Sequence, residues 1–338
     1  MNWYVQNGKE SDVIFSSRVR LSRNIKGYPF KTKGTEEELK EIYNKMKEIT
    51  PLIGYNLKFL SMQDMDELTK QSLVEKHMIS PDFAKTKLPY TAIIINDEEN
   101  ICIMINEEDH IKLQVFTSGL DIDNILNLAI EIDEKLEELV PYSYHQKYGY
   151  LTACPTNVGT GLKVSTLVHL PGLEMTGNLS KVLNVVNGLG MNVRGVYGEG
   201  TKAEGAIYQI SNNQTLGITE KEIAKNLNWI TQKIIEQERV ARKYLSKNSI
   251  KLEDKVYRDY GILTNAKRLS EEESIELLSS VKLGTDLGII KELTDKKVSE
   301  LILYTKPANI QKRLGKKLSI LNQEIARCEV IKQIVKED

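Results

Sequence analysis

Residues 91–106 read Thr91-Ala-Ile-Ile-Ile-Asn-Asp-Glu-Glu-Asn-Ile-Cys-Ile-Met-Ile-Asn106 and contain two apolar runs separated by a polar segment. Both runs are rich in isoleucine, whose β-branched side chain favours extended strands. The segment between them, 97–100, is short and polar, as a loop between two paired strands would be. The stretch therefore predicts an antiparallel β-hairpin, and with it the start of the sheet structure.

Amphipathic helices are expected both before and after this hairpin in the sequence. Thr35 and Glu38 form a capping box, as do Thr219 and Glu222, and each pair precedes apolar residues at helical spacing. Proline or glycine marks the expected ends of several helices. The expected helices are 36–49 up to Pro51, about 64–78, the segment that Asp123 caps and Pro141 ends, 179–189 before Gly190, and a long helix from 220 to 244.

Short strands broken by glycine are expected between residues 148 and 211. Strand pairs combined with one long helix, without regular strand–helix–strand repeats, predict an α+β fold in which helices flank an antiparallel sheet. After a polar boundary at 246–251 no further strand is expected, and caps at Ser270 and Thr294 predict an all-helical tail. The expected strands are 150–152, 163–170, 191–197 and 206–211, and the last expected helix is 321–335.

Composition argues against several classes of protein. The 338 residues include 46 Lys and Arg against 47 Asp and Glu, a net charge of −1 without a block of like charges, which disfavours direct nucleic-acid binding. No apolar run reaches the roughly 18 residues that span a membrane, and the N-terminus lacks the apolar core of a secretion signal. Three widely spaced cysteines without a CxxC pair fit the reducing cytoplasm. Four histidines without paired-ligand spacing give no reason to expect a protein-bound metal.

Arginines and carboxylates are the remaining candidates for chemistry, because the sequence has no GxxxxGK[ST] loop, no Rossmann glycine pattern and no GxSxG elbow. Arg18 and Arg20 would share one face of a strand and could hold a polyphosphate, or they could form a solvated basic strand. The acidic run at 106–110 could hold a guanidinium or Mg²⁺, or be a solvated loop. Cys154 heads a turn-rich loop, where a lone cysteine is more often a small buried hydrophobe than a nucleophile.

Four segments nevertheless occur together and in order: SSRVRLSRN at 16–24, NEEDHIKLQ at 106–114, GYLTACPTNVGTGL at 149–162 and RGVYGEGTKAEGAIYQISN at 194–212. They resemble the successive signatures of the phosphagen (guanidino) kinase family over about residues 10–245. The NEEDHIKLQ form and the helical tail are most similar to the bacterial branch that phosphorylates arginine side chains in proteins, in stress response and protein quality control. The resemblance implies a small N-terminal lobe (1–85), a catalytic core (86–248) and a helical C-terminal domain (255–338) for dimerisation or phosphoarginine binding.

The resemblance also implies roles for individual residues, with ATP as cofactor and Mg²⁺ carried by the nucleotide. Glu108 would be the general base, and Glu199 would help to orient the guanidinium. A Cys154 thiolate would balance its positive charge, and Arg194 would stabilise the transferred phosphoryl group. The implied nucleotide-binding residues are Ser16, Ser17, Arg18, Val19, Arg20, His77, Lys112, Lys163, Val164, Ser165, Thr166, Leu167, Arg194, Gly195, Val196, Tyr197, Gly198 and Glu199.

The sequence departs from the family pattern at two kinds of position. Lys112 and Lys163 stand where the family usually has arginine, and lysine keeps the charge but loses the forked pair of donors, so reduced or retuned activity is expected. In the tail, Gln323, Glu324 and Arg327 match a phosphoarginine-binding motif that lacks its first arginine here, so the stretch could equally be one face of a helix. The expected partners are protein substrates with exposed arginine, a zinc-binding activator, a stress-gene repressor, a Clp-type protease and a second copy of the chain.

Two other functions stay open. One is a kinase of a free small guanidine, which the short segment before residue 16 disfavours, because the family uses a large N-terminal domain to enclose small substrates. The other is a weakly active adaptor that binds phosphoarginine proteins or represses transcription. Lys112 and Lys163 favour the adaptor, whereas the intact Glu108, Glu199 and Cys154 weigh against it.

Overall fold

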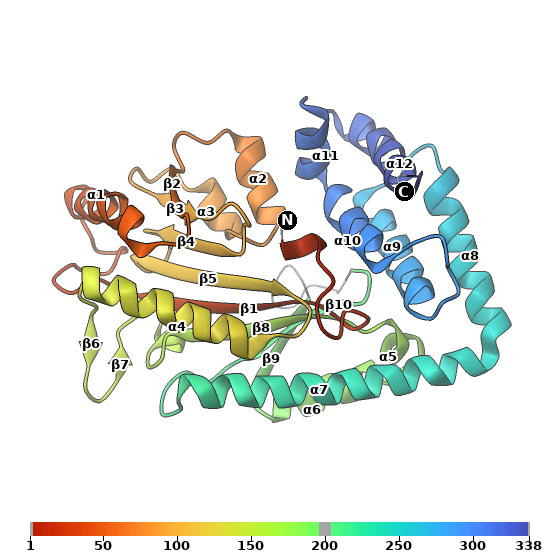
Figure 1. The fold of residues 1–338 in the computed structure, drawn as a ribbon, viewed down its shortest axis with the longest axis horizontal. Coiled ribbons are helices and arrows are strands. Elements are labelled where there is room, and N and C mark those ends of the chain that lie inside the picture. The colour runs from red at the N-terminus through yellow and green to blue at the C-terminus, as the bar shows by residue number, and fades with distance from the viewer. Residues whose placement is uncertain (1–2, 196–203, 337–338) are drawn as a thin grey trace.

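The computed structural model describes residues 3–195 and 204–336, and within them eight strands form one antiparallel sheet flanked by helices (Figure 1). The expected α+β class is confirmed. The two runs of the opening stretch pair as an antiparallel hairpin, Ile95 opposite Cys102. In sheet order the strands are β2 (Lys58–Ser61), β3 (Ala92–Ile95), β4 (Ile101–Ile105), β5 (Ile111–Ser118), β1 (Ile14–Arg23), β8 (Leu162–His169), β10 (Ile207–Asn212) and β9 (Met191–Gly195).

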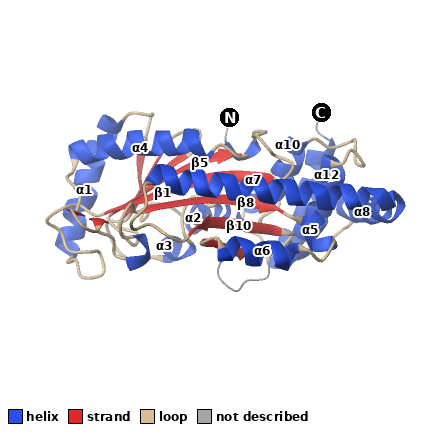
Figure 2. Ribbon diagram, turned by 90° about the horizontal axis from the view of Figure 1, so that it is seen from below, coloured by secondary structure: helices blue, strands red, loops and turns tan. Residues whose placement is uncertain are grey.

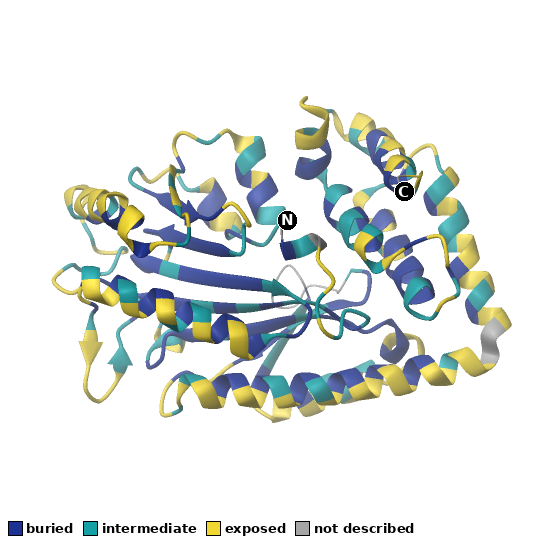
Figure 3. Cartoon of the chain, in the orientation of Figure 1, coloured by how far each residue is buried: buried dark blue, intermediate teal, exposed yellow. Residues whose placement is uncertain are grey.

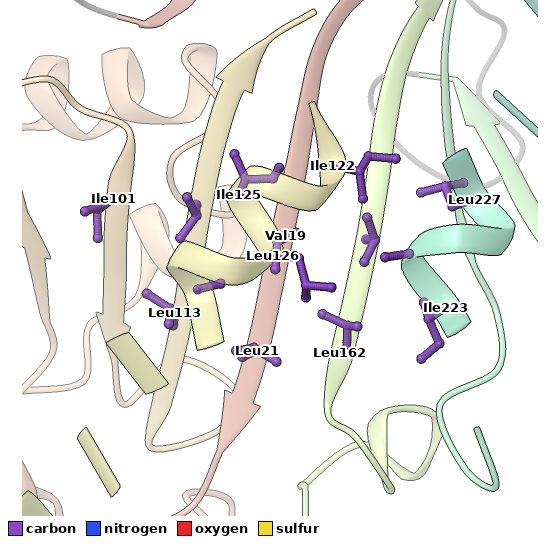
Figure 4. Close-up of a cluster of buried hydrophobic side chains, with 14 of the residues drawn as sticks. Val19, Leu21, Ile101, Leu113, Ile122, Ile125, Leu126, Leu162, Ile223 and Leu227 are labelled. Atoms are coloured by element: carbon purple, nitrogen blue, oxygen red, sulfur yellow. The ribbon is translucent and has the colours of Figure 1, made fainter. Parts of the chain in front are cut away.

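Two long helices, α4 (Ile122–Leu139) and α7 (Glu220–Leu245), lie across one face of this sheet (Figure 2). The main apolar core lies between the sheet and these helices. There Val19 and Leu21 of β1 belong to the same cluster as apolar side chains of both helices (Figure 4). Both helices bury a single stripe and expose the rest to solvent (Figure 3). We call this side of the sheet the helix-covered face.

The opposite face is apolar at one end and polar at the other. At β3 to β5 it packs with Leu73 of α2 (Glu67–Glu75) and Phe83 of α3 (Pro81–Lys85), which is why every residue of β3 and β4 is buried. Two buried faces explain the continuous isoleucine runs, which do not alternate with polar residues. At β1, β8 and β10 the same face carries the charged residues of the candidate site.

The described tail after residue 245 is helical, as expected. A short turn, η3 (Ser246–Asn248), leads from α7 directly into α8, where a polar linker was expected. Apolar side chains of four of these helices form a cluster of their own. The division at 1–85, 86–248 and 255–338 stays a prediction. The helices are α8 (Ser249–Asn265), α9 (Glu271–Asp286), α10 (Asp295–Tyr304), α11 (Pro307–Leu314) and α12 (Ile320–Lys336).

Several expected boundaries were wrong. Helix α1 (Glu36–Ile53) continues through Pro51, because the proline lies in its exposed last turn while Ile49 and Ile53 are buried in the core. Asp121, and not Asp123, is the N-cap of α4. The expected helix 64–78 is the shorter α2, and β2 and β5 were not anticipated. The remaining elements are α5 (Pro171–Met175), α6 (Leu179–Gly188), β6 (Tyr144–His145), β7 (Gly149–Tyr150), η1 (Trp3–Val5) and η2 (Pro155–Asn157).

Candidate active site

Alternation along β1 decides which residues of the first signature can meet a ligand. Val19 is buried on the helix-covered face, so Arg18 and Arg20 lie on the opposite face. The antiparallel register places Ser165 of β8 opposite Arg18 and Lys163 opposite Arg20. Three cationic side chains of two neighbouring strands therefore share one face, which we call the cationic face.

The same alternation places the other implied nucleotide-binding residues on one or the other face of the sheet. Ser16 and Leu167 are paired across β1 and β8, and Arg194 pairs with Gln209, which is itself opposite Leu167, so all lie on the cationic face. The side chains of Ser17, Val19, Val164 and Thr166 lie on the other face, where the Ser17 hydroxyl donates to the Gly119 carbonyl at 2.8 Å. Gly195 ends β9, and Val196, Tyr197, Gly198 and Glu199 lie outside the described residues.

The electrostatics of Arg18 and Arg20 on the cationic face favour the binding of an anion. Burial, and secondly the neighbouring Arg20, lowers the pKa of Arg18 well below its ordinary value. Burial also lowers the pKa of Arg20, an effect that Glu107 opposes. Arg18 donates to Gln209 Oε1 at 3.0 Å, whereas the buried Nε of Arg20 has no hydrogen-bond partner among the described residues. A phosphate group would supply an acceptor for Arg20 Nε and a negative charge beside Arg18.

The acidic loop separates two neighbouring glutamates into different environments. Glu107 is only 11% exposed at its side chain and accepts from Lys112 Nζ and from the Ser80 hydroxyl, each at 2.8 Å. Although burial opposes the effect, Lys112 holds the pKa of Glu107 below its ordinary value. The Glu108 side chain is 44% exposed and lies 3.8 Å from Lys112 Nζ. Glu107 therefore holds the lysine, and Glu108 is the carboxylate that a substrate can reach.

Asp109, the next residue, joins this loop to the cysteine loop. Its Oδ1 accepts two hydrogen bonds of 2.7 Å, one from the backbone N–H of Ala153 and one from Asn24 Nδ2. Asn24 follows β1 and also accepts from the His110 backbone N–H at 3.0 Å. Both Asp109 and Asn24 are fully buried. Asp109 was expected only as one member of the acidic run at 106–110, and no role was expected for Asn24, although both residues lie inside the quoted signatures.

Cys154 directly follows the anchored Ala153. Its side chain is half-buried, and Sγ lies 3.0 Å from the Thr156 hydroxyl. The backbone carbonyl of Cys154 accepts from the Thr152 hydroxyl at 2.8 Å. The network thus fixes the backbone on both sides of the thiol and leaves the sulfur accessible. Glu108 and Cys154 are each one residue away from the Asp109–Ala153 hydrogen bond.

His77 lies beside the cationic face at the end of α2. Its backbone carbonyl accepts from Arg18 at 3.4 Å, and its φ of 60° is in the left-handed region. Burial, followed by the nearby cations Lys306 and Arg18, lowers the pKa of His77 to about 3. A small cavity beside Arg18 is lined by Trp3, Ser16, Arg18, His77, Phe116, Ser165, Leu167 and Gln209.

The pKa of His77 predicts how acid affects stability. The native imidazole stays neutral down to about pH 3, whereas in the unfolded chain it binds a proton below about pH 6.5. Because only the unfolded chain gains this proton, the free energy of unfolding decreases as the pH falls below about 6.5. In His77→Asn, asparagine tolerates the left-handed backbone at this position. Between pH 7 and pH 5 we expect the free energy of unfolding of this variant to fall by about 2 kcal/mol less than that of the parent. Urea unfolding at both pH values measures this. His145→Gln, at an exposed histidine, is the control, and equal losses in His77→Asn and the parent would contradict the expectation.

The tail residues compared with a phosphoarginine motif have structural contacts. Arg327 is buried and donates to the backbone carbonyls of Thr305 at 2.8 Å and Leu269 at 2.7 Å. Glu324 forms an ion pair with Arg268 at 2.8 Å, and Gln323 donates to the Leu318 carbonyl at 3.0 Å. These are the contacts of a helix face that holds α12 against its neighbours.

Comparison with known proteins first defines the class. A model of the ATP:guanido phosphotransferase C-terminal catalytic domain matches residues 34–241. Among solved structures, the chain is similar to a duplicated taurocyamine kinase from Schistosoma mansoni, with a TM-score of 0.61 and 26% identity over 69% of this chain and 33% of that one. It is also similar to a lombricine kinase, with a TM-score of 0.60 and 25% identity over 69% and 68%.

The tail and the curated relatives narrow this class. The model of the protein-arginine kinase McsB C-terminal domain matches residues 249–338. The protein-arginine kinase of Halothermothrix orenii is 44% identical, over 98% of this chain and 95% of the relative. That of Bacillus cereus strain G9842 is 43% identical, over 98% and 94%. The chain belongs to the ATP:guanido phosphotransferases, in the protein-arginine kinase family.

Proposed function

We propose that this chain transfers the γ-phosphoryl group of ATP to the guanidinium of arginine side chains in proteins. The observation that carries the proposal is the cationic face, where the partly buried Arg18 and Arg20 of β1 lie next to β5, the strand that directly follows the acidic loop. The relatives that match almost the whole chain are named protein-arginine kinases, which supports arginine as the acceptor.

The residues divide the chemistry between them. Arg18, Arg20 and Lys163, joined by Arg194, bind the phosphates and neutralise the charge that develops during transfer. Guanidinium is protonated at neutral pH and is a poor nucleophile, so a base must remove a proton as its nitrogen attacks the γ-phosphorus. The bond between that phosphorus and the β,γ-bridging oxygen breaks as the new N–P bond forms, and ADP leaves. Glu108, the exposed carboxylate, takes that proton. Cys154, as thiolate, offsets the positive charge of the guanidinium during binding.

Mg²⁺ enters this proposal with the nucleotide. Within residues 3–195 and 204–336, no group of three or more His, Cys, Asp or Glu side chains could hold a metal ion. The ion would supply further charge neutralisation on the phosphate oxygens, while the arginines set their position. Glu107 is engaged by Lys112, so it stabilises the loop and leaves Glu108 for the substrate.

The setting of the reaction is also a proposal. We propose a cytoplasmic enzyme of stress response and protein quality control that works as a dimer with a zinc-binding activator, a stress-gene repressor and a Clp-type protease. The membership in the protein-arginine kinase family supports this setting. In the part of the chain that the structure describes, no helix is long and apolar enough to cross a membrane.

A labelling experiment tests the activity. The purified chain is incubated with γ-labelled ATP, Mg²⁺ and an unfolded protein rich in arginine, with a version of that protein in which lysine replaces every arginine as the control. We expect acid-labile label on the arginine protein only, because the phosphorus–nitrogen bond of phosphoarginine is cleaved by acid. In a parallel reaction with free arginine as the acceptor, label on that arginine would instead favour a metabolite kinase. ATP binding without label, even with an activator present, would favour the adaptor and make Lys112 and Lys163 the first positions to restore to arginine.

A further inference from the structure

A second, larger cavity of about 120 Å³ lies between the sheet and the helical tail. Its inner wall includes His77 and Leu167, and the N-terminal segment with η1 borders it. Trp3 of η1 stacks on Phe116 of β5 with 5.2 Å between the ring centroids. Figure 1 shows this segment between the sheet and α10. The outer wall comes from the tail, with Ile275 of α9, and Ser299 and Ile302 of α10.

This cavity continues the small cavity beside Arg18. The two share Trp3, Ser16, His77 and Leu167 as lining residues. A ligand whose phosphates bind the cationic face therefore has the larger cavity at its other end. Its walls are mostly apolar, with polar groups such as Ser299 and Lys306 among them, as suits a flat aromatic base attached to a polar sugar.

Direct contacts hold the outer wall in place. At the end of α2, the Glu75 carboxylate accepts from the backbone N–H groups of Ala308 at 2.7 Å and Asn309 at 2.9 Å, at the start of α11. Ser72 donates to the Asn309 side chain at 2.7 Å. The Ser11 hydroxyl donates to Asp295 of α10 at 3.2 Å. Helices α10 and α11 are thus fastened to the body beside His77.

A buried ionic cluster fastens the tail on the other side of the cavity. Arg242 of α7 pairs with Asp286 of α9 at 3.0 Å and with Glu238 at 2.7 Å. Lys282, which also lines the cavity, pairs with Asp286 at 2.9 Å. Because partners from the body and the tail are buried together, separating them would leave unpaired charges. The outer wall is therefore preformed.

We propose that α10 and its junction with α11 form the outer wall of the nucleoside site, so that the helical tail itself takes part in binding the base and ribose. The proposal rests on the proposed function, because it takes the triphosphate to lie on the cationic face. Ser299 and Ile302 are the specificity-determining contacts on α10, and Lys306 lies at the polar edge of the cavity. The tail would thereby distinguish a nucleotide from a bare polyphosphate.

Filling the outer wall tests this directly. In the full-length chain, Ser299→Trp places an indole where the base would lie. We expect its Kd for ATP, measured by calorimetry with Mg²⁺, to rise about tenfold or more, and its Kd for inorganic tripolyphosphate to change less than about twofold. Lys296→Trp, at an exposed position of the same helix, is the control and should bind both as the parent does. Ser299→Val is the milder variant should the tryptophan prevent folding, with an expected rise of about threefold.

The outcomes separate the two proposals. A parent chain that binds neither ATP nor tripolyphosphate would overturn the proposed function. A parent that binds both, with folded Ser299 variants whose Kd for ATP is unchanged, would overturn the outer-wall inference alone. Equal weakening of ATP and tripolyphosphate in these variants would also overturn it, because a wall of the nucleoside site should not affect a ligand without a base.

Discussion

Replacing Glu108 with glutamine is expected to lower the rate of phosphoryl transfer to arginine by about 10²- to 10⁴-fold. Glutamine keeps the size and the hydrogen-bonding oxygen of the side chain but cannot take up the proton that the attacking nitrogen must lose. Because Glu108 is 44% exposed and lies 3.8 Å from Lys112, its ion pair contributes little to folding. The variant should therefore unfold at the same urea concentration as the parent.

Single-turnover kinetics with saturating ATP and an arginine-rich protein measure this effect. Glu134→Gln, on the exposed side of α4, is the matched control and should react at the parental rate. Calorimetry should give the same Kd for ATP in all three proteins, since Glu108 acts on the acceptor. Turnover by Glu108→Gln within about threefold of the parent would assign the proton transfer to another group.

The second large effect is expected for Asp109→Ala. The substitution removes the acceptor of two buried hydrogen bonds, so Ala153 N–H and Asn24 Nδ2 each lose one partner. We expect a loss of about 2–4 kcal/mol in the free energy of unfolding. At temperatures where the variant is folded, we also expect kcat to fall about 100-fold, because small displacements of reacting groups are costly.

Cys154 supplies a readout specific to this network. Cys102 and Cys328 are buried, so alkylation of the native chain reports mainly on Cys154. A displaced loop should change that alkylation rate in Asp109→Ala, and Asp109→Asn, which retains Oδ1, should restore much of it. Leu136→Ala, a core substitution on α4 expected to cost about 2–5 kcal/mol, is the control for stability. Parental kcat and alkylation in folded Asp109→Ala would leave Asp109 with a structural role only.

Local patterns were sufficient for much of the fold. The isoleucine runs at 91–96 and 101–106 predicted the hairpin, and the capping boxes at Thr35 and Thr219 predicted the starts of two helices. Where local signals compete with burial, they misled. Pro51 did not end α1, because buried Ile53 holds the last turn on the core. Helix α4 begins two residues earlier than expected, with Asp121 at the N-cap position and without a side-chain capping hydrogen bond.

For the candidate site, too, some features could be predicted from the sequence and others required the tertiary structure. Spacing alone indicated that Arg18 and Arg20 share a face, because side chains alternate along any strand. It could not indicate that Lys163 and Ser165 lie opposite them, since that depends on the register between β1 and β8. Nor could it distinguish Glu107 from Glu108, which are adjacent in sequence. Only the fold shows that Lys112 lies 2.8 Å from the Glu107 carboxylate, while the Glu108 side chain stays 44% exposed.

The sequence by itself determined the class of fold and the types of residue available for chemistry, because strand propensity, helix caps and side-chain chemistry are local properties. Only the tertiary structure decided which of those residues meet. It joined Asp109 to Ala153 across the sheet, and it placed α10, more than 200 residues after His77, beside that histidine. Such contacts depend on how distant segments bury their apolar faces together, which no local pattern encodes.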